Sequence, residues 1–134
     1  MLDTTDYGPG SFVANIEAAT LNNENYRTTL WTGHNLQVTL MAIQPGHEIG
    51  LEVHKDHDQF LRIEEGQATV YMGPVQDELE TWQASNDDAV IVPAGTWHNL
   101  INSGDIPLKI YSIYAPPQHP HGTVQGTKAD TDKI

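Results

Sequence analysis

Short runs of alternating hydrophobic and polar residues recur along most of the chain and predict β-strands. In Asn35–Gln44, for example, Leu36, Val38, Leu40 and Ala42 alternate with Gln37, Thr39, Met41 and Ile43. Successive residues of a strand point to opposite faces of a sheet, so this alternation is typical of a strand. Similar runs, separated by turn residues, occupy Tyr26–Thr32, Gly50–His54, Gln59–Glu64, Gln67–Met72, Leu79–Gln83, Ala89–Val92, Trp97–Ile101 and Leu108–Tyr114. About eight or nine short strands at this spacing predict a sandwich or a closed double sheet.

The two ends of the chain depart from this pattern. Met1–Ser11 is polar and predicts an arm of low order, and Phe12–Ile16 predicts a short edge strand. Glu17–Asn25 holds Ala and Leu among Asn but is too short to establish a helix. After Tyr114 the prolines lack the N–H groups that a central strand needs, so we expect an extended tail that ends in a disordered Lys128–Ile134.

Composition excludes several classes of partner and site. The net charge of −12, from 18 acidic and 6 basic residues, argues against a nucleic-acid partner, because phosphate binding needs clustered Lys or Arg. No apolar run approaches the ~20 residues of a membrane span, and the N-terminus lacks the features of a signal peptide, so we expect a cytoplasmic protein without membrane contact. The chain has no cysteine, which leaves only oxygen and nitrogen atoms as metal ligands.

Four polar residues in the strand-rich region are candidates for one metal site. Glu52 and His54 are two residues apart, so on a strand they share a face at a spacing of about 6.6 Å. Gln59 opens the next alternating run, and His98 follows a turn that contains Gly95. Two antiparallel hairpins would therefore carry Glu52, His54, Gln59 and His98 in one cluster.

This region resembles the first motif of the cupin superfamily. That motif runs Gly, five residues, His-x-His, three or four residues, Glu, six residues, Gly. Gly46 and Gly66 occupy the two glycine positions, and His54 stands at the second histidine position. Glu52 replaces the first histidine and Gln59 replaces the glutamate, so the ligand set differs from the usual one of the family.

The second cupin motif follows the turn. It runs Gly, five residues, Pro-x-Gly, two residues, His, three residues, Asn, and it is matched at Pro93, Gly95, His98 and Asn102. Asp87 stands where the leading glycine belongs. For Asn102 we expect a turn-capping side chain rather than a substrate contact.

The resemblance covers roughly Trp31–Tyr114 and implies the fold class. It implies an all-β double-stranded β-helix, the cupin jelly-roll barrel, to which the sequence adds an N-terminal arm and an extended Pro-rich C-terminal tail. We divide the chain into the arm and edge strand at 1–30, the cupin barrel at 31–115 and the tail at 116–134. No internal repeat is present, which indicates one cupin unit. Cupins of this size are commonly dimers, and Leu51 and Val53 would point outward and need cover, so we expect a homodimer.

The candidate ligands define the expected chemistry. Glu52, His54 and His98 supply one carboxylate and two imidazoles, a set that leaves coordination positions open for water, substrate or O2. We expect one divalent transition metal per chain, with Fe or Mn favoured and Ni or Zn possible. Gln59 either binds the ion directly or orients a bound water, and the sequence leaves both open.

Other polar residues are weaker candidates. His47, His119 and His121 could act as acid or base groups: His47 lies in a loop, whereas His119 and His121 lie in the tail, which either closes over the barrel mouth or stays solvated. Arg27 and Arg62 could bind an anion only if they turn inward, and the alternation points Arg62 outward.

Three functions remain open from the sequence. The first is a metal-dependent enzyme of the dioxygenase type that acts on a small oxygenated substrate. The second is a non-redox isomerase, lyase or decarboxylase in which the ion polarises a carbonyl. The third is a non-catalytic cupin that binds a small ligand. Because the chain is acidic, we expect a small-molecule substrate or ligand that is neutral or singly charged.

Overall fold

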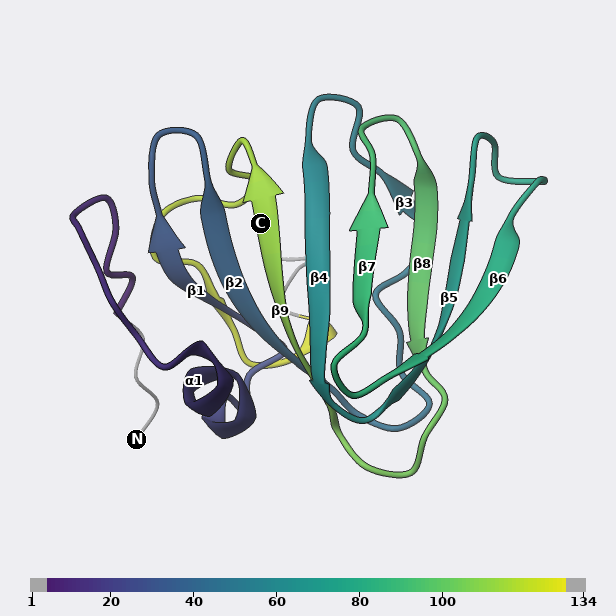
Figure 1. Ribbon diagram of the computed structural model, residues 1–134, viewed down its shortest axis with the longest axis horizontal. Helices are drawn as coiled ribbons and strands as arrows, with labels where there is room; N and C mark the ends of the chain where they lie inside the picture. Colours follow the sequence, from purple (N-terminus) through teal and green to yellow (C-terminus); the bar gives the residue numbers. More distant parts are fainter. Residues whose placement is uncertain (1–4, 130–134) are drawn as a thin grey trace.

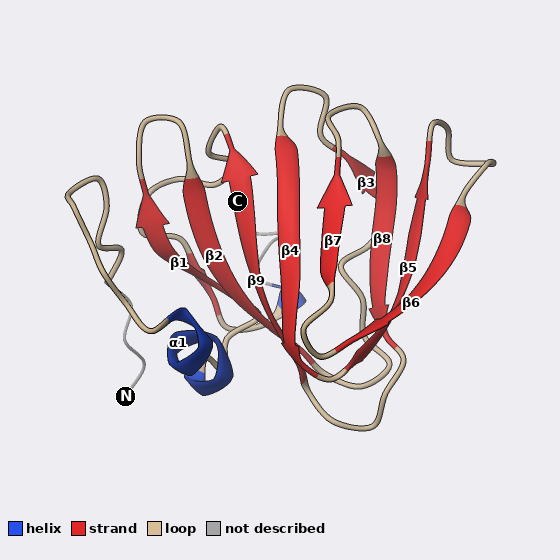
Figure 2. Ribbon diagram, in the orientation of Figure 1, coloured by secondary structure: helices blue, strands red, loops and turns tan. Residues whose placement is uncertain are grey.

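Two antiparallel β-sheets make up most of the chain in a computed structural model that describes residues 5–129 (Figures 1 and 2). The six-stranded sheet has the order β10 (Val124–Gln125), β1 (Arg27–Thr32), β2 (Gln37–Ile43), β9 (Leu108–Ala115), β4 (Asp58–Glu65) and β7 (Ala89–Val92). The four-stranded sheet has the order β3 (Glu52–Val53), β8 (Trp97–Asn102), β5 (Gln67–Gly73) and β6 (Glu80–Ser85). This arrangement confirms the expected all-β double-stranded β-helix.

The hydrophobic core lies between the two sheets. Its buried members come from both sheets and include Met41, Ile43, Leu61, Ile63, Ala68, Val70, Val90, Val92, Leu100, Leu108 and Ile110. In β2, Met41 and Ile43 are 0% and 1% exposed, and their neighbours Leu40 and Ala42 on the other face are also buried. The outer face of the six-stranded sheet is therefore covered as well.

A short helix supplies part of this cover. α1 (Ile16–Asn22) contacts β2, β4 and β9 and lies outside the sheet in Figure 1. The prediction of an edge strand at Phe12–Ile16 was wrong, since that segment has no strand and α1 begins at its last residue. The Asn15 side chain accepts a hydrogen bond from the backbone N–H of Ala18 at 2.9 Å and so caps the helix, a local signal that favours a helix start. Within residues 5–129, no helix has the length and apolar character that a membrane span requires.

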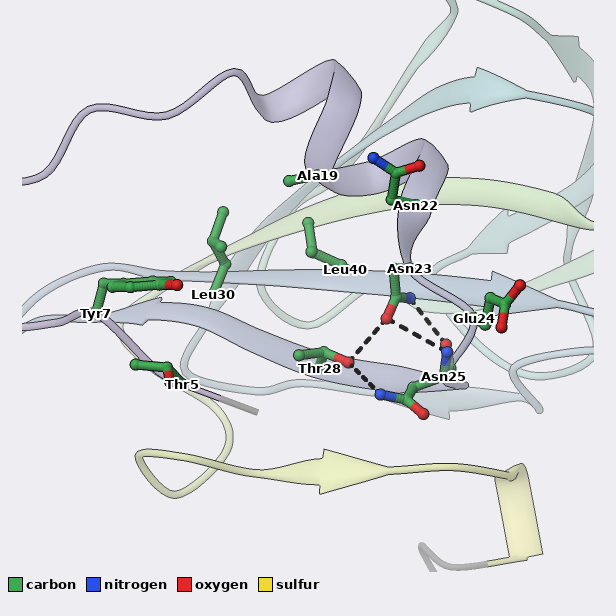
Figure 3. A pocket seen from close by; sticks show the side chains of 10 residues that line it. All are labelled: Thr5, Tyr7, Ala19, Asn22, Asn23, Glu24, Asn25, Thr28, Leu30 and Leu40. Atoms are coloured by element: carbon green, nitrogen blue, oxygen red, sulfur yellow. Dashed lines mark hydrogen bonds between the residues drawn. The ribbon is translucent and has the colours of Figure 1, made fainter. Parts of the chain in front are cut away.

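A cavity of about 210 Å³ lies beside α1 (Figure 3). Its polar side chains bind one another: Asn23 Oδ1 accepts from Thr28 Oγ1 at 2.8 Å, and Asn25 Nδ2 donates to the same hydroxyl at 2.9 Å. The amide nitrogen of Asn23 donates to the backbone oxygen of Asn25. Because these groups satisfy each other, we assign this network a structural role.

The C-terminal segment returns to the sheet, which the sequence did not predict. Pro116 follows the end of β9, and residues further on form the edge strand β10, in which Gln125 pairs with Arg27 of β1. Lys128 and Ala129, which were expected to be disordered, have defined positions, whereas the remainder of that prediction, residues 130–134, lies outside the described residues. The prolines do not interrupt this strand, because β10 begins only after the last of them.

Asp6 joins the N-terminal segment to β1 and to the C-terminal segment. Its carboxylate accepts hydrogen bonds from Thr32 N at 2.9 Å, Thr32 Oγ1 at 2.6 Å, Gly8 N at 3.0 Å and Gly122 N at 3.0 Å. Burial alone would raise the pKa of Asp6, but these hydrogen bonds outweigh it and hold the pKa below its ordinary value. The low order predicted for Met1–Ser11 is therefore not found at residues 5–11, and residues 1–4 lie outside the described part.

The backbone explains two glycine positions of the motifs. Asp87 has a φ of 74°, in the left-handed region that glycine adopts most readily and that Asp also tolerates. Asp87 can therefore replace the leading glycine of the second motif, and its carboxylate accepts a hydrogen bond from Arg62 at 3.0 Å. Gly66 has a φ of 112°, and a Cβ at this position would lie 3.1 Å from the Leu108 Cα. Both the conformation and the space favour glycine there.

Asn102 confirms the turn-capping prediction. Its side chain is 1% exposed, and Nδ2 donates to the backbone oxygens of Ile43 and Ile106, both at 2.8 Å. Its Oδ1 accepts from Gly104 N at 2.9 Å. Asn102 therefore stabilises the turn after β8.

We expect Asp6→Asn to lower the free energy of unfolding at neutral pH by about 1–3 kcal/mol. The neutral amide loses the charge-assisted hydrogen bonds, and its NH2 group would face the N–H and O–H donors that now bind the carboxylate. A carboxyl group whose pKa is lowered by folding stabilises the protein above the unfolded-state pKa, about 3.9 for Asp, and loses this effect as the pH falls through the folded-state pKa. The difference between wild type and variant should therefore shrink below about pH 4.

Chemical denaturation at several pH values measures this difference. Asp77→Asn is the matched control, because Asp77 is exposed in the loop between β5 and β6. An Asp6→Asn variant that matches the control at neutral pH would contradict the assigned role.

Candidate metal centre

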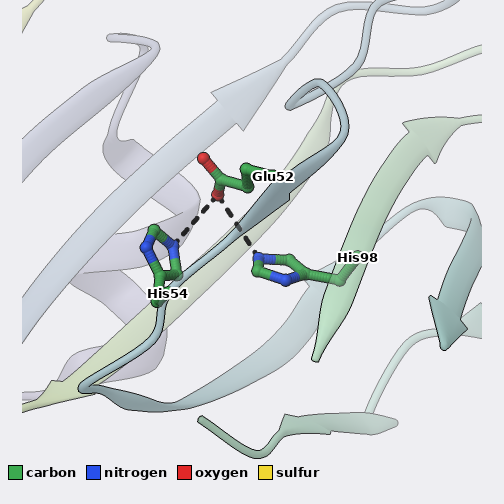
Figure 4. A group of neighbouring side chains, drawn as sticks. All are labelled: Glu52, His54 and His98. Atoms are coloured by element: carbon green, nitrogen blue, oxygen red, sulfur yellow. Dashed lines mark hydrogen bonds and ion pairs between the residues drawn. The ribbon is translucent and has the colours of Figure 1, made fainter. Parts of the chain in front are cut away.

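Three side chains from neighbouring strands meet at one end of the four-stranded sheet (Figure 4). Glu52 in β3 pairs directly with His98 in β8, so the two side chains leave the same face, and His54 follows the end of β3. Glu52 Oε1 lies 3.2 Å from His54 Nε2 and 3.4 Å from His98 Nε2. One potential ligand atom of each residue lies within 4.8 Å of the others, a spacing at which the group could hold one metal ion.

The orientation of His98 favours a cation. Its ring is 4% exposed, and Nδ1 lies 3.0 Å from the carbonyl oxygen of Thr96, which can only accept a hydrogen bond. In the neutral ring the proton therefore resides on Nδ1, and Nε2 directs its lone pair toward Glu52. Nε2 is buried and has no hydrogen-bond partner. A cation between the carboxylate and this nitrogen would satisfy both.

Glu52 carries its charge over the ordinary pH range. Burial alone would raise its pKa, but the adjacent imidazoles, His54 first and then His98, lower the pKa to about 2. The side chain is 36% exposed, so the carboxylate also borders open space. The carboxylate itself is therefore charged, and a divalent cation bound here would replace any proton that lies between it and the imidazoles.

Gln59 lies in β4, in the opposite sheet, and is 2% exposed. Its amide nitrogen donates to Ser112 Oγ at 2.8 Å, whereas its amide oxygen is buried without a hydrogen-bond partner. The oxygen is therefore free to accept from a bound water or to bind an ion. Direct ligation by Gln59 stays a prediction.

Glu52 and His54 open into a cavity of about 350 Å³. Residues in or next to β1, β3 and β9 line it together with the C-terminal segment: Tyr26, Arg27, Ile49, Glu52, His54, Tyr114, Gln118, His119, Pro120, Gln125 and Lys128. Burial raises the pKa of both tyrosines, so their phenols stay protonated and can donate hydrogen bonds. The cavity is large enough for a small organic molecule beside the three candidate ligands.

The C-terminal segment brings His119 to this cavity. Of the two alternatives for the tail, the structure places His119 at the barrel mouth, because the buried Gln37 of β2 binds its backbone. Gln37 Oε1 accepts from His119 N at 2.9 Å and Gln118 N at 3.1 Å, and Gln37 Nε2 donates to His119 O at 2.7 Å. A glutamine on the inner face of β2, among apolar residues, was the sequence signal that could have indicated this contact.

His119 is a neutral imidazole at neutral pH. Burial, and then the positive charge of Arg27, lower its pKa to about 4. Its ring packs edge-on against Tyr114 with 5.3 Å between the ring centroids, and Nε2 is buried without a hydrogen-bond partner. His119 can therefore accept a proton or a hydrogen bond from a molecule in the cavity.

The other two weak candidates do not line this cavity. His121 is more than half exposed, and its Nε2 lies 2.9 Å from the backbone oxygen of Gly8 and 3.3 Å from the Asp6 carboxylate. His47 is exposed and borders a different cavity near Lys128. The structure thus separates both from Glu52, His54 and His98.

The two arginines turn in opposite directions. Arg62 points outward, as the alternation predicted, and pairs with Glu64 and Asp87. Arg27 is 6% exposed and turns into the cavity. The sequence left its direction open, because β1 is buried on both faces at this end.

Comparisons with known proteins place this chain in a family. The family model described as "Cupin domain" matches residues 39–114. YrkC of Bacillus subtilis (strain 168), an uncharacterized protein, is 59% identical over 126 residues, which cover 93% of this chain and 68% of that protein. L612 of Acanthamoeba polyphaga mimivirus, also an uncharacterized protein, is 38% identical over 84% of this chain and 70% of its own length. The crystal structure of BH2720 from Bacillus halodurans is 57% identical, with a TM-score of 0.95 over 97% of this chain and 99% of that chain.

More distant structures share the fold alone. Oxalate decarboxylase from Lactobacillus farciminis, solved as a formate complex, is 22% identical with a TM-score of 0.59. The match covers 65% of this chain and 26% of that enzyme. This barrel therefore also occurs within a larger enzyme.

We expect Gln37→Leu to loosen the segment that carries His119. The variant removes the acceptor of two backbone N–H groups, each hydrogen bond contributing about 0.5–1.5 kcal/mol, so the amides of Gln118 and His119 should exchange roughly tenfold faster. Hydrogen exchange read by NMR measures both amides. Gln76→Leu, in an exposed loop, is the control, and unchanged exchange in Gln37→Leu would show that other contacts hold the segment.

Proposed function

This chain belongs to the cupin family, and on that premise we propose that it is a metal-dependent small-molecule enzyme in which Glu52, His54 and His98 bind one divalent ion. The observation that carries the proposal is the buried Nε2 atom of His98, which has no hydrogen-bond partner and lies 3.4 Å from the Glu52 carboxylate. Two imidazoles and one carboxylate match the donors that divalent transition metals accept. The group also borders the cavity of about 350 Å³, so a bound molecule could reach the ion.

The donor set favours Fe(II) or Mn(II), and Ni(II) or Zn(II) would also fit. Gln59 is proposed as a further neutral donor, either to the ion or to a water bound to it, because its amide oxygen is buried without a partner. His98 keeps its orientation through the carbonyl of Thr96. Such support fixes the tautomer and direction of a ligating imidazole.

The favoured reaction is of the dioxygenase type on a small oxygenated substrate. A bound ion would supply open positions for substrate and O2, or act as a Lewis acid. The chain's own residues would do the rest: His119 accepts a proton from the substrate, the phenols of Tyr26 and Tyr114 donate hydrogen bonds to it, and the tail segment limits access of water. Gln37 holds His119 in place for this role.

Two alternatives use the same site. A non-redox isomerase, lyase or decarboxylase would use the neutral imidazole of His119 beside the cavity as a proton acceptor that needs no O2, although its pKa of about 4 makes it a weak base. The distant oxalate decarboxylase shows that the barrel fold is compatible with such chemistry. A cupin that only binds a small ligand would use the same cavity without turnover.

We also propose a homodimer in the cytoplasm. β3 is an edge strand of its sheet, and Leu51 beside it is 41% exposed. An open edge flanked by an exposed apolar side chain favours pairing with a second copy. Light scattering of the purified chain would give twice its mass of 14.8 kDa, and a monomer would contradict the proposal.

We expect His98→Ala to abolish stoichiometric metal binding. Wild-type protein that is loaded with Fe(II), Mn(II) or Zn(II) and then desalted should hold one ion per chain by elemental analysis. The variant should hold less than about one-tenth of that amount, because it lacks one of the three proposed metal ligands. His34→Ala is the control, because His34 is exposed on the turn before β2. Equal metal content in wild type and His98→Ala would remove the proposed site.

Activity tests separate the alternatives. We expect the Fe(II) form, prepared without oxygen, to consume O2 when it is supplied with diketones, enediols or catechols, and the Zn(II) form to be inactive in the same assay. Turnover of a substrate by both forms without O2 consumption would favour the non-redox alternative. A raised melting temperature with a panel compound, without turnover in either metal form, would favour the ligand-binding alternative.

A further inference from the structure

Arg27 places a positive charge inside the cavity that Glu52 and His54 border. The residue is 6% exposed, and its guanidinium lies over the ring of Tyr26 at 5.1 Å from the centroid. Nη1 donates to Gln125 Oε1 at 2.5 Å. Nε is buried and has no hydrogen-bond partner. A strong donor group of a charged side chain is therefore left unsatisfied at the cavity.

Arg27 also lacks a negatively charged partner within residues 5–129. The ion pairs of this part of the chain involve Arg62, His54, His98 and His121, but not Arg27. Removing a charged group from water costs several kcal/mol unless an opposite charge and hydrogen bonds compensate for it. The neutral Gln125 and the ring of Tyr26 compensate only in part, so the arrangement suits an anion.

The charge around the cavity is opposite to that of the chain. Two of its six basic residues, Arg27 and Lys128, line this cavity, whereas Glu52 is the one acidic residue among the described residues that line it. With neutral histidines, these three give the lining a net charge of +1, in a chain whose net charge is −12. The cavity is thus a local positive site on an acidic protein, which draws in small anions.

We propose that Arg27 binds the carboxylate of a small organic acid, and that a second oxygen of the same molecule points toward Glu52, His54 and His98. The inference rests on the proposed function, since it names the substrate class of that site: monocarboxylic acids with an adjacent oxo or hydroxyl group. A guanidinium presents several N–H donors in a plane that matches a carboxylate. The phenols of Tyr26 and Tyr114 supply further donors on the same cavity wall.

A purely structural role for Arg27 explains less. Its hydrogen bond to Gln125 does tie β1 to β10, and this contact accounts for Nη1. It does not account for the unpaired Nε or for a second basic residue in the same cavity. A neutral side chain could have made the contact to Gln125 without a buried charge.

Binding of acids and their uncharged esters tests the proposal without turnover. The probes are pyruvate, lactate and phenylpyruvate, each compared with its methyl ester by calorimetry on full-length protein, both metal-free and loaded with Zn(II). We expect at least one acid to bind about tenfold or more tightly than its ester, because an ester cannot form the charge-assisted pair. In Arg27→Gln this preference should fall to within about twofold, and Arg27→Lys should retain part of it. Arg62→Gln is the control, because Arg62 points outward.

A direct spectroscopic readout separates binding from a structural role. In ¹⁵N-labelled wild-type protein, the Arg27 Nε–H resonance should shift with the acid and not with its ester, while the Arg62 resonance stays in place. Preference for inorganic phosphate over every acid, no preference of any acid over its ester, or an unchanged preference in folded Arg27→Gln would overturn the inference. If Arg27→Gln does not fold, the shift of the wild-type Arg27 Nε–H resonance and the preference of Arg27→Lys for acids over esters test the inference instead.

The two proposals fail in different ways. Protein that binds one metal ion per chain but shows no preference for acids keeps the proposed metal centre and loses the role of Arg27. Protein that prefers acids in its metal-free form, but never retains an ion, keeps the role of Arg27 and loses the metal-dependent function.

Discussion

The register between β3 and β8 is the constraint on which the candidate site depends. It sets Glu52 directly opposite His98, so a carboxylate and an imidazole leave the same face of the four-stranded sheet. A slip of one residue would turn one of them to the other face. β3 contains only two residues, so its own pairing cannot hold this register strongly. Contacts on either side of it do so: Ile49 N donates to Leu100 O, and Gly95 N donates to His54 O at 2.8 Å. The turn that carries Gly95 of the second motif is thus tied to His54 of the first motif.

The cavity is completed by segments that lie outside the barrel strands. The C-terminal segment carries His119 across the mouth, and two buried polar side chains hold it: Gln37 binds its backbone, and Asp6 binds Gly122 together with β1. The N-terminal segment, the first strand and the C-terminal segment are therefore coupled through hydrogen bonds to buried side chains. Loss of one such bond leaves a buried polar group unpaired, which costs more than the bond itself contributes. The C-terminal segment at the mouth of the cavity is consequently an ordered part of the fold and not a solvated tail.

Within residues 5–129, four of the six buried side-chain atoms without a hydrogen-bond partner belong to residues that line the cavity or are candidate metal ligands. Within residues 5–129, the buried side-chain atoms without a hydrogen-bond partner are Arg27 Nε, Thr39 Oγ1, Gln59 Oε1, Glu64 Oε1, His98 Nε2 and His119 Nε2. Arg27 and His119 line the cavity, His98 faces Glu52, and Gln59 is a candidate ligand from the opposite sheet. Folded proteins satisfy most buried polar groups, so such a concentration indicates a place that other molecules complete. A cation beside His98 and a small anion beside Arg27 would satisfy the buried atoms of these two residues.

The sequence by itself determined the sheet content, the turn positions and the residues of the candidate metal site. Alternation marked nearly every barrel strand, and the motif spacing predicted that Glu52, His54 and His98 lie together, because strand periodicity and turn glycines are local properties of the chain. Only the tertiary structure decided that β10 returns to β1 and that His119 and Arg27 face the cavity. Those outcomes depend on partners about 80 to 100 residues away, such as Gln37 with His119 and Arg27 with Gln125. No local pattern specifies such pairings, since they form only when the two sheets have already fixed where each segment can lie.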